Sequence, residues 1–398
     1  MCNRDDQDGQ GTDRQDGHRE QSMVAAYSWH PGACCVAPLW AIPVSVLPDE
    51  ILSSWLVRAA LAQGCDPLAL TGVFWPKWRA WTRDTDRAIA ENRLSQLALV
   101  SGISTRHFQA GTLQAVASCI QGGLPSNKAI WPWILALGAR NTKRRSGQQY
   151  CPMCLSTDTI PYFRLHWRFA WQTGCEWHNC ALADRCWNCA APIEPHRLRA
   201  DAIHVAICPT CKADLRDSVP EGCLVSALTF QREVDRVVHE QRGQMFGRPV
   251  KAAAWLGVAD FFVSLIRRAS RSGTTGLMSL IDRMGASIPQ TMPTMAGAGL
   301  ELLRVHDRQG IFEATWYFLA ADKGSFQRAL KGSGITRQGL CGKGEPVPAL
   351  IAEFAESLPN KLVSRKRRSA PGATSPRPRH EVLRMMARLE RRMEMVLR

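Results

Sequence analysis

The sequence lacks an apolar run long enough to cross a membrane, which takes about 18 to 20 residues. The best candidate, residues 252–266, is shorter and contains Asp260. The uncharged stretch 23–48 is interrupted by four prolines and follows an acidic segment, whereas a signal peptide begins with positive charge. We therefore expect no membrane association and no export, and we place the protein in the cytoplasm.

The chain also lacks the short motifs of common catalytic sites. Gly342-Lys343 is followed by another glycine and has no upstream glycine at the spacing of a phosphate-binding loop. There is no HExxH, no GxSxG and no GxGxxG in a nucleotide-fold setting. Scattered carboxylates such as Asp260, Asp282 and Glu301 are not gathered by any pattern. The sequence predicts a binding protein and not an enzyme.

The sequence has fewer acidic than basic residues. It contains 35 Asp and Glu and 50 Lys and Arg, which gives a net charge of +15. A basic protein that does not bind membranes is expected to bind an anionic partner such as DNA. Residues 361–398 contribute much of this charge, with 12 basic and three acidic residues. We expect DNA contacts from the basic run in this tail, which consists of Arg365, Lys366, Arg367 and Arg368.

The length of 398 residues exceeds that of a typical domain, so several folding units are expected. Apolar residues recur at helical spacing over nine segments: 51–64, 86–100, 104–120, 127–140, 226–242, 250–271, 298–320, 325–332 and 347–358. We predict a mainly α multidomain protein with small β zinc ribbons. Its parts are a disordered leader and extended segment (1–40), an N-terminal helical domain (41–140), a tandem zinc-ribbon module (150–218), a C-terminal helical domain (225–360) and a basic tail (361–398) with a short amphipathic helix. Twelve of the 14 tryptophans precede residue 190, and we expect most of them in the core.

The middle segment contains paired ligands at the spacing that structural zinc sites use. The predicted pairs are Cys151 with Cys154, Cys175 with His178, Cys186 with Cys189, and Cys208 with Cys211. Eight ligands predict two structural zinc ions, because four protein ligands per ion leave no open position for catalysis. Two alternatives stay open: Cys180 in place of His178, and a cross-braced pairing of the two units.

Two segments have the small residue, turn glycine and apolar pair of a helix-turn-helix. The first runs from Ala98 through Gly102 to Phe108 and predicts outward-facing Thr105, Arg106, His107 and Gln109. The second, weaker copy runs from Leu330 through Gly334 to Leu340, with Thr336, Arg337 and Gln338 exposed. A recognition helix in a DNA groove would place its contacts there. A helix corner without a DNA role has the same needs, so both interpretations stay open.

The end of the tail carries apolar residues at alternating steps of four and three, the spacing of a two-heptad seam. These residues are Val382, Met386, Leu389, Met393 and Val396. Two heptads are too short to be stable alone, so we expect the seam to dock on a partner, which leaves a homodimer open, or on the body of the protein. A solvated tail is the alternative.

Several of these motifs together resemble the TniQ family of transposition proteins. The matching residues are Leu47-Pro48-Asp49-Glu50-Ile51-Leu52 and the following residues to Arg58, Tyr150-Cys151-Pro152 with Cys154, the segment from Pro161 to Arg168, Cys175 with His178, and Asp184-Arg185-Cys186 with Cys189. The resemblance covers about residues 40 to 218. It implies a non-enzymatic, nucleoid-associated bacterial protein that selects the target site of a transposon. Such a protein bridges target DNA, or a guide-RNA targeting complex, to an AAA+ ATPase regulator that activates a DDE transposase. The resemblance also implies that the segment from Ala98 to Phe108 is the family's N-terminal helix-turn-helix.

Two other functions stay open from the sequence. A zinc-containing transcription regulator would bind its own operator and recruit no ATPase. A divergent nuclease would need metal-dependent strand cleavage, for which the sequence offers no gathered carboxylates.

Overall fold

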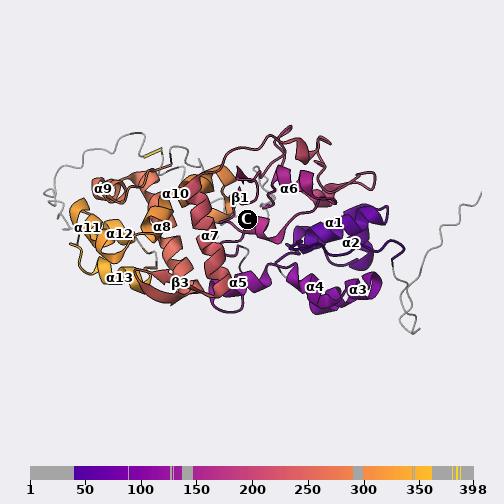
Figure 1. The fold of residues 1–398 in the computed structure, drawn as a ribbon, viewed down its shortest axis with the longest axis horizontal. Coiled ribbons are helices and arrows are strands. Elements are labelled where there is room, and N and C mark those ends of the chain that lie inside the picture. Colours follow the sequence, from indigo (N-terminus) through magenta and orange to yellow (C-terminus); the bar gives the residue numbers. More distant parts are fainter. Residues whose placement is uncertain are drawn as a thin grey trace, which may run out of the picture. The chain divides into compact units, whose positions relative to one another are not determined.

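The computed structural model describes residues 40–87, 89–125, 128, 130–136, 147–289, 299–342, 344 and 346–360, together with 379, 382, 383 and 386. The leader, the basic run at 365–368 and most of the C-terminal seam lie outside the described residues. Leu39–Arg398 form one compact unit, in which helices dominate (Figure 1). The mainly α prediction is confirmed. None of the described helices is long and apolar enough to cross a bilayer.

The first helices are α1 (Leu52–Ala62), α2 (Pro67–Phe74), α3 (Glu91–Ser101), α4 (Thr105–Ala110) and α5 (Gln114–Gln121), with a 3₁₀ turn at Ala80–Thr82. Helix α1 buries Leu52, Trp55 and Leu56, which pack against Leu94 and Leu97 of α3 and against Phe108 of α4 in one cluster. The aromatic rings of Trp55 and Phe108 lie 4.6 Å apart. The apolar residues that recur from residue 51 onward therefore form the face of α1 that packs against α3 and α4.

The helix expected over 127–140 is wrong for the part that the structure describes. Residues 130–136 form a turn and an isolated bridge between Ile134 and Phe169. Pro132 lacks a backbone N–H and Trp133 has a φ of 64°, and both features oppose a helix. The apolar residues here are buried because Trp133 packs beside Phe312 and Trp171, with ring centroids 6.0 and 6.5 Å away.

The middle segment has little regular structure. It contains α6 (Pro152–Thr157), the two-residue strands β1 (Gly174–Cys175) and β2 (Cys180–Ala181), and short 3₁₀ turns at Leu165–Arg168, Pro195–Arg197 and Leu215–Asp217. The strands are antiparallel and pair Cys175 with Cys180. Most of the buried side chains from this segment form one cluster that includes six cysteines. Because these strands are so short, backbone hydrogen bonds alone do not account for the order of the segment.

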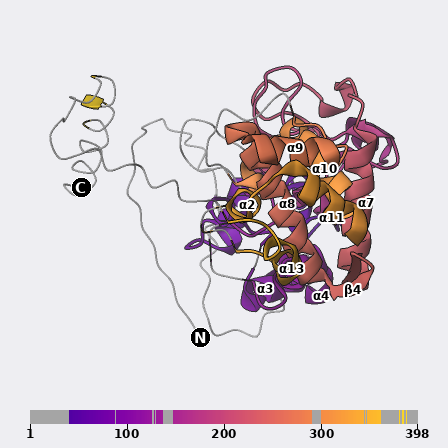
Figure 2. The same ribbon diagram turned by 90° about the vertical axis from the view of Figure 1, so that its left-hand side faces the viewer.

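The C-terminal part begins with α7 (Val225–Glu240), the hairpin of β3 (Arg242–Met245) and β4 (Arg248–Lys251), and the long α8 (Ala252–Ser272). Then follow α9 (Thr275–Arg283), a 3₁₀ turn at Leu300–Leu302, α10 (Val305–Leu319), α11 (Lys323–Ser333), α12 (Arg337–Cys341) and α13 (Ala349–Ala355). Helix α10 packs on both α7 and α8, while α9 contacts α8, α11 and α12 (Figures 1 and 2). The expected helices of this half are confirmed, with the segment at 298–320 divided into a 3₁₀ turn and α10.

Two fully buried arginines join segments that are distant in the sequence. Arg168 donates to Asp84 at 2.6 Å and to Asp86 at 2.8 Å, and thereby fixes the loop before α3. Arg308 of α10 donates to the side chain of Gln149 at 2.7 Å and to the carbonyls of Ala170 and Gln172. Because burial removes a guanidinium from water, each cation depends on these acceptors.

Candidate functional site

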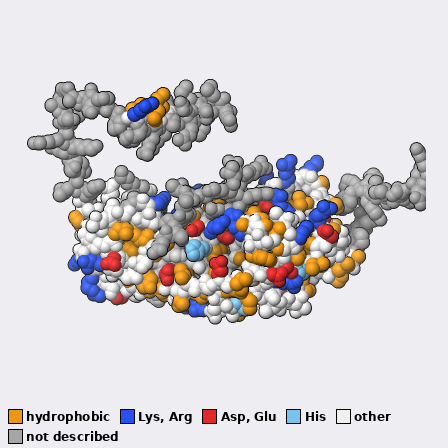
Figure 3. All heavy atoms as spheres, turned by 90° about the horizontal axis from the view of Figure 1, so that it is seen from above, with side chains coloured by type: hydrophobic (Ala, Val, Ile, Leu, Met, Phe, Trp, Pro, Cys, Tyr) orange, Lys and Arg blue, Asp and Glu red, His pale blue; other side chains and the backbone are white. Residues whose placement is uncertain are grey.

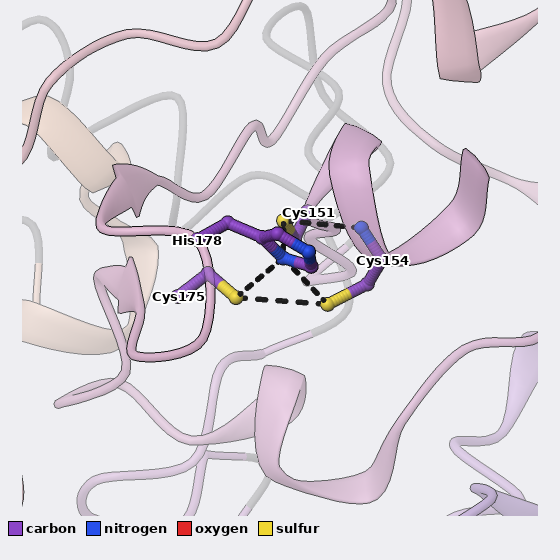
Figure 4. A group of neighbouring side chains, drawn as sticks. All are labelled: Cys151, Cys154, Cys175 and His178. Carbon is purple, nitrogen blue, oxygen red and sulfur yellow. Dashed lines mark hydrogen bonds between the residues drawn. The ribbon is translucent and has the colours of Figure 1, made fainter. Parts of the chain in front are cut away.

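The first four-residue cluster lies between α6 and the β1–β2 turn (Figure 4). Cys151 caps the N-terminus of α6, where its sulfur accepts a bond from the Cys154 N–H at 3.4 Å. The Cys154 and Cys175 sulfurs are 3.6 Å apart. His178 places Nδ1 at 3.5 Å from Cys151 and at 3.4 Å from both Cys154 and Cys175. The helix and the hairpin thus direct four ligand atoms to one point.

The second cluster is built from two turns of the same design. The N–H of Ala190 donates to the carbonyl of Cys186, and the N–H of Lys212 donates to that of Cys208, each at 2.9 Å. Ala190 and Lys212 have φ values of 55° and 66° although neither is glycine. The sulfur pairs Cys186–Cys211 and Cys189–Cys208 are 3.6 and 3.7 Å apart. The ligands therefore group sequentially, and the cross-braced alternative does not occur.

The spacing of the sulfurs fits a tetrahedral zinc ion. With Zn–S bonds of about 2.3 Å, the sulfurs of a tetrahedral site lie roughly 3.8 Å apart. The donor atoms of each group all lie within 4.8 Å of one another. Two clusters that can each hold a zinc ion are therefore present, as the sequence predicts. In each cluster four protein ligands would fill the tetrahedral coordination of zinc, which leaves no coordination position for a substrate.

The pKa values of the cysteine thiols differ within each cluster. Hydrogen bonds from Cys154, Cys175 and Cys180 hold the pKa of Cys151 far below its ordinary value, whereas the pKa of Cys154 is raised. In the second cluster burial raises the pKa of Cys186 to about 12. Burial also acts to raise the pKa of Cys211, but bonds from the Ala213 N–H and the neighbouring thiols lower it to about 7. Without a metal ion only some thiolates can coexist, and a bound cation favours them all.

Cys180 is a fifth thiol beside the first cluster. Its sulfur lies 3.5 Å from that of Cys151 and is buried, but it is not one of the four atoms that group together. His178, in contrast, is near all three cysteines of the group. The geometry favours His178 as the fourth ligand and leaves Cys180 as a neighbour within hydrogen-bond distance of the Cys151 sulfur.

The sequence reasoning missed two exposed tryptophans within the ligand pairs. Trp177 and Trp187 are 69% and 50% exposed, although tryptophan is usually largely buried. Trp177 precedes His178, and Trp187 follows Cys186 and donates from Nε1 to the carbonyl of Asp214 at 2.8 Å. Their position between two ligands is the signal that could have identified them, because the x2 positions of such a turn face away from the metal.

The first helix-turn-helix candidate has the expected local geometry. Gly102 ends α3 with a φ of 71°, and Phe108 of α4 is buried. Arg106, His107 and Gln109 are exposed, whereas Thr105 is half-buried. Gln109 donates to Glu91 of α3 at 2.7 Å, and His107 pairs with Ser104 at 2.7 Å. An acidic side chain, that of Glu91, therefore lies beside Gln109.

The second candidate has the same form with a more basic surface. Gly334 follows α11 with a φ of 65°, Thr336 accepts from the Gly339 N–H at the start of α12, and Leu340 is buried. Arg337 and Gln338 are exposed. Residues 323–341 contain four basic residues and no acidic one. The charge favours this element for contact with an anion, although its sequence signature is the weaker of the two.

Basic charge is not gathered in one patch on the face shown in Figure 3, where Lys and Arg side chains are interspersed with acidic and hydrophobic ones. The predicted DNA contacts at Arg365, Lys366, Arg367 and Arg368 lie outside the described residues. The structure therefore leaves the DNA-contact residues as predictions.

Residues 41–182 match the model of the TniQ family. The match covers somewhat over a third of the chain, includes α1 to α6 and the first cluster, and ends before the second. Residues 41–182 are thus similar to the TniQ family, which confirms the resemblance up to residue 182. No curated protein matches the chain. TniQ proteins are transposition accessory proteins and generally non-catalytic, so the match associates this protein with transposition.

Proposed function

We propose that this protein selects the target site for a transposon and bridges target DNA, or a targeting complex that carries a guide RNA, to an AAA+ ATPase regulator and through it to a DDE transposase. The observation that carries the proposal is the TniQ match at 41–182, with a four-ligand cluster inside it. The protein itself performs no chemical step in this proposal.

The two clusters serve as structural zinc sites in this proposal. Cys151, Cys154, Cys175 and His178 hold one ion, and Cys186, Cys189, Cys208 and Cys211 hold the other. The support is the closed, four-donor geometry of each group. Zinc supplies the order that the short strands of this segment do not provide, because the unfolded chain lacks the assembled ligand set and the free energy of metal binding therefore adds to the free energy of folding.

The proposed DNA contacts come from three places. Arg106, His107 and Gln109, with the half-buried Thr105, belong to α4; Arg337 and Gln338 belong to α12; and the tail contributes its basic run. Exposure of the side chains on α4 and α12 supports the first two. Arginine and glutamine suit this role because both bind base edges with paired hydrogen bonds.

The test is capture of the cognate AAA+ ATPase by the purified, zinc-loaded protein on target DNA. We expect the ATPase to co-purify and the ternary complex to stimulate transposition. A transcription regulator, the alternative function, would bind its operator and retain no ATPase. Strand cleavage by the protein alone, in the presence of a divalent metal, would contradict the non-catalytic proposal and favour a nuclease.

A further inference from the structure

Helix α8 and the segment before α13 form an open apolar groove. It has a volume of about 560 Å³ and is lined by Gly257, Val258 and Phe261 on one side and by Pro346, Val347 and Leu350 on the other. This volume lies within the range of roughly 300–1,000 Å³ that is common for ligand sites. Asp260 is the one charged residue among those that line it. An apolar groove beside a helix suits an amphipathic helix as its occupant.

Gly257 is the most informative residue of this groove. It lies inside the long helix α8, where glycine is less favourable than alanine, and it is exposed. Its φ is not positive, and a Cβ atom there would meet nothing within 4 Å. The described fold therefore gives no reason for a glycine at this position. A partner whose backbone approaches α8 closely would give one, because glycine leaves room for such an approach.

The tail carries an apolar face that lacks a cover among the described residues. Val382, Leu383 and Met386 are helical and are 40%, 56% and 54% exposed. The sequence continues the seam through Leu389 and Met393. Such a face is stable in water only when another surface covers it.

We propose that residues 382–396 of the tail dock in the α8 groove of the same chain, with the seam facing Gly257 and Phe261. The lengths agree, since Ala254 to Ser264 spans about 15 Å of α8 and Val382 to Met393 about 16 Å of a helix at 1.5 Å per residue.

The connection is long enough for this docking. The described body ends at residue 360, a few residues after α13, and the N-terminal end of α13 lines the groove through Ala349 and Leu350. The 21 residues from 361 to 381 reach up to about 70 Å when extended. Helix α13, in comparison, is about 10 Å long. The docking does not depend on the proposed function.

The experiment is amide hydrogen exchange of residues 381–397 in the full-length protein without DNA. We expect these amides to exchange at least tenfold more slowly than in a free peptide of the same sequence. Gly257→Leu fills the groove and Met386→Asp charges the seam, and each is expected to return the segment to the rate of the free peptide. Leucine is a good helix former, so Gly257→Leu keeps α8 intact.

Two matched controls accompany these variants. Gly72→Leu makes the same change at another exposed helical glycine, where a Cβ also meets nothing within 4 Å. Ala387→Asp adds the same charge beside the seam. Both are expected to leave the protection in place. Exchange at the free-peptide rate in the unaltered protein overturns the proposal. Protection that disappears on dilution also overturns it and assigns the seam to a second copy, and protection that requires added DNA assigns the tail to DNA.

Discussion

Asp235 of α7 is a half-buried carboxylate. It accepts bonds from the indole of Trp171 at 2.7 Å and from the side-chain amide of Gln172 at 2.7 and 2.8 Å. Burial raises its pKa from 3.8 to about 6 although these bonds act to lower it. The folded state therefore holds a proton at pH 5 that the unfolded chain releases.

This shift predicts the pH dependence of stability. Because the folded-state pKa is raised, the contribution of Asp235 is fully present below about pH 4 and is lost as the pH rises through 6. We expect the free energy of unfolding of Asp235→Asn, relative to that of the unaltered protein, to increase by roughly 3 kcal/mol across this window. Denaturant unfolding at a series of pH values measures it, with the exposed Asp282→Asn as control. Parallel curves for Asp235→Asn and the unaltered protein would show that this carboxyl does not titrate there.

The ligand residues predict a stoichiometry. The purified protein is expected to contain two zinc ions per chain, and Cys151→Ser and Cys208→Ser are each expected to remove one. Elemental analysis measures this, with Cys65→Ser as a control because that thiol is in neither cluster. Removal of one ion is also expected to lower the melting temperature, because structural zinc contributes folding energy. Folded protein without zinc would end the proposal for both sites.

At the level of elements, glycines in different surroundings predict opposite effects. A Cβ at Gly243 of β3 would lie 2.6 Å from Cδ1 of Trp255 and 2.9 Å from Cγ2 of Val237, both in the core. Gly243→Ala is therefore expected to cost about 1–3 kcal/mol. Gly72→Ala in α2 meets no atom and is expected to stabilise by up to about 1 kcal/mol. Chemical denaturation of the two variants measures both, and equal effects would contradict the close approach of β3 to α8.

Variants in the two helix pairs, α3–α4 and α11–α12, can distinguish a role in DNA binding from a role in helix packing. Arg106→Ala and Arg337→Ala are each expected to weaken DNA binding by about 1–3 kcal/mol without a change in melting temperature if both helices contact bases. Because residues 323–341 carry no acidic residue, we expect Arg337→Ala to have the larger effect. Gly102→Val serves as the packing control and is expected to reduce stability, since Gly102 has a φ of 71°. An unchanged isotherm for both arginine variants would move the DNA contact to the tail.

For the whole molecule, the tail predicts the salt dependence of DNA binding. Each contact between a basic side chain and a phosphate releases counterions, so affinity falls steeply with salt. Deletion of residues 361–398 removes 12 of the 50 basic residues and is expected to flatten this slope while any sequence preference remains. Binding isotherms at several salt concentrations measure it. A truncated protein with the full slope would exclude the tail from the interface.

Local patterns in the sequence predicted the parts of this molecule that local chemistry determines. The CxxC spacing identified both metal clusters, and apolar periodicity identified α1, α7 and α8. The helix over 127–140 was wrong because Trp131, Trp133 and Ile134 are buried by aromatic partners from elsewhere in the chain, and their spacing only resembled a helix. The roles of Arg168 and Arg308 could not be predicted, because Asp86 lies 82 residues from Arg168, and Gln172 and Gln149 lie 136 and 159 residues from Arg308.

The buried guanidinium of Arg308 bears on the choice of boundaries for a fragment of this protein. The family match ends at residue 182, but Arg308 donates to Gln149, Ala170 and Gln172 within it. A fragment cut after the match would lose this donor together with the aromatic surface of Phe230 and Phe312 that covers Trp133. A chimaera that joins residues 41–182 to another C-terminal half therefore needs a cation at the position of Arg308. We therefore expect residues 41–182 to be less stable alone than in the full chain.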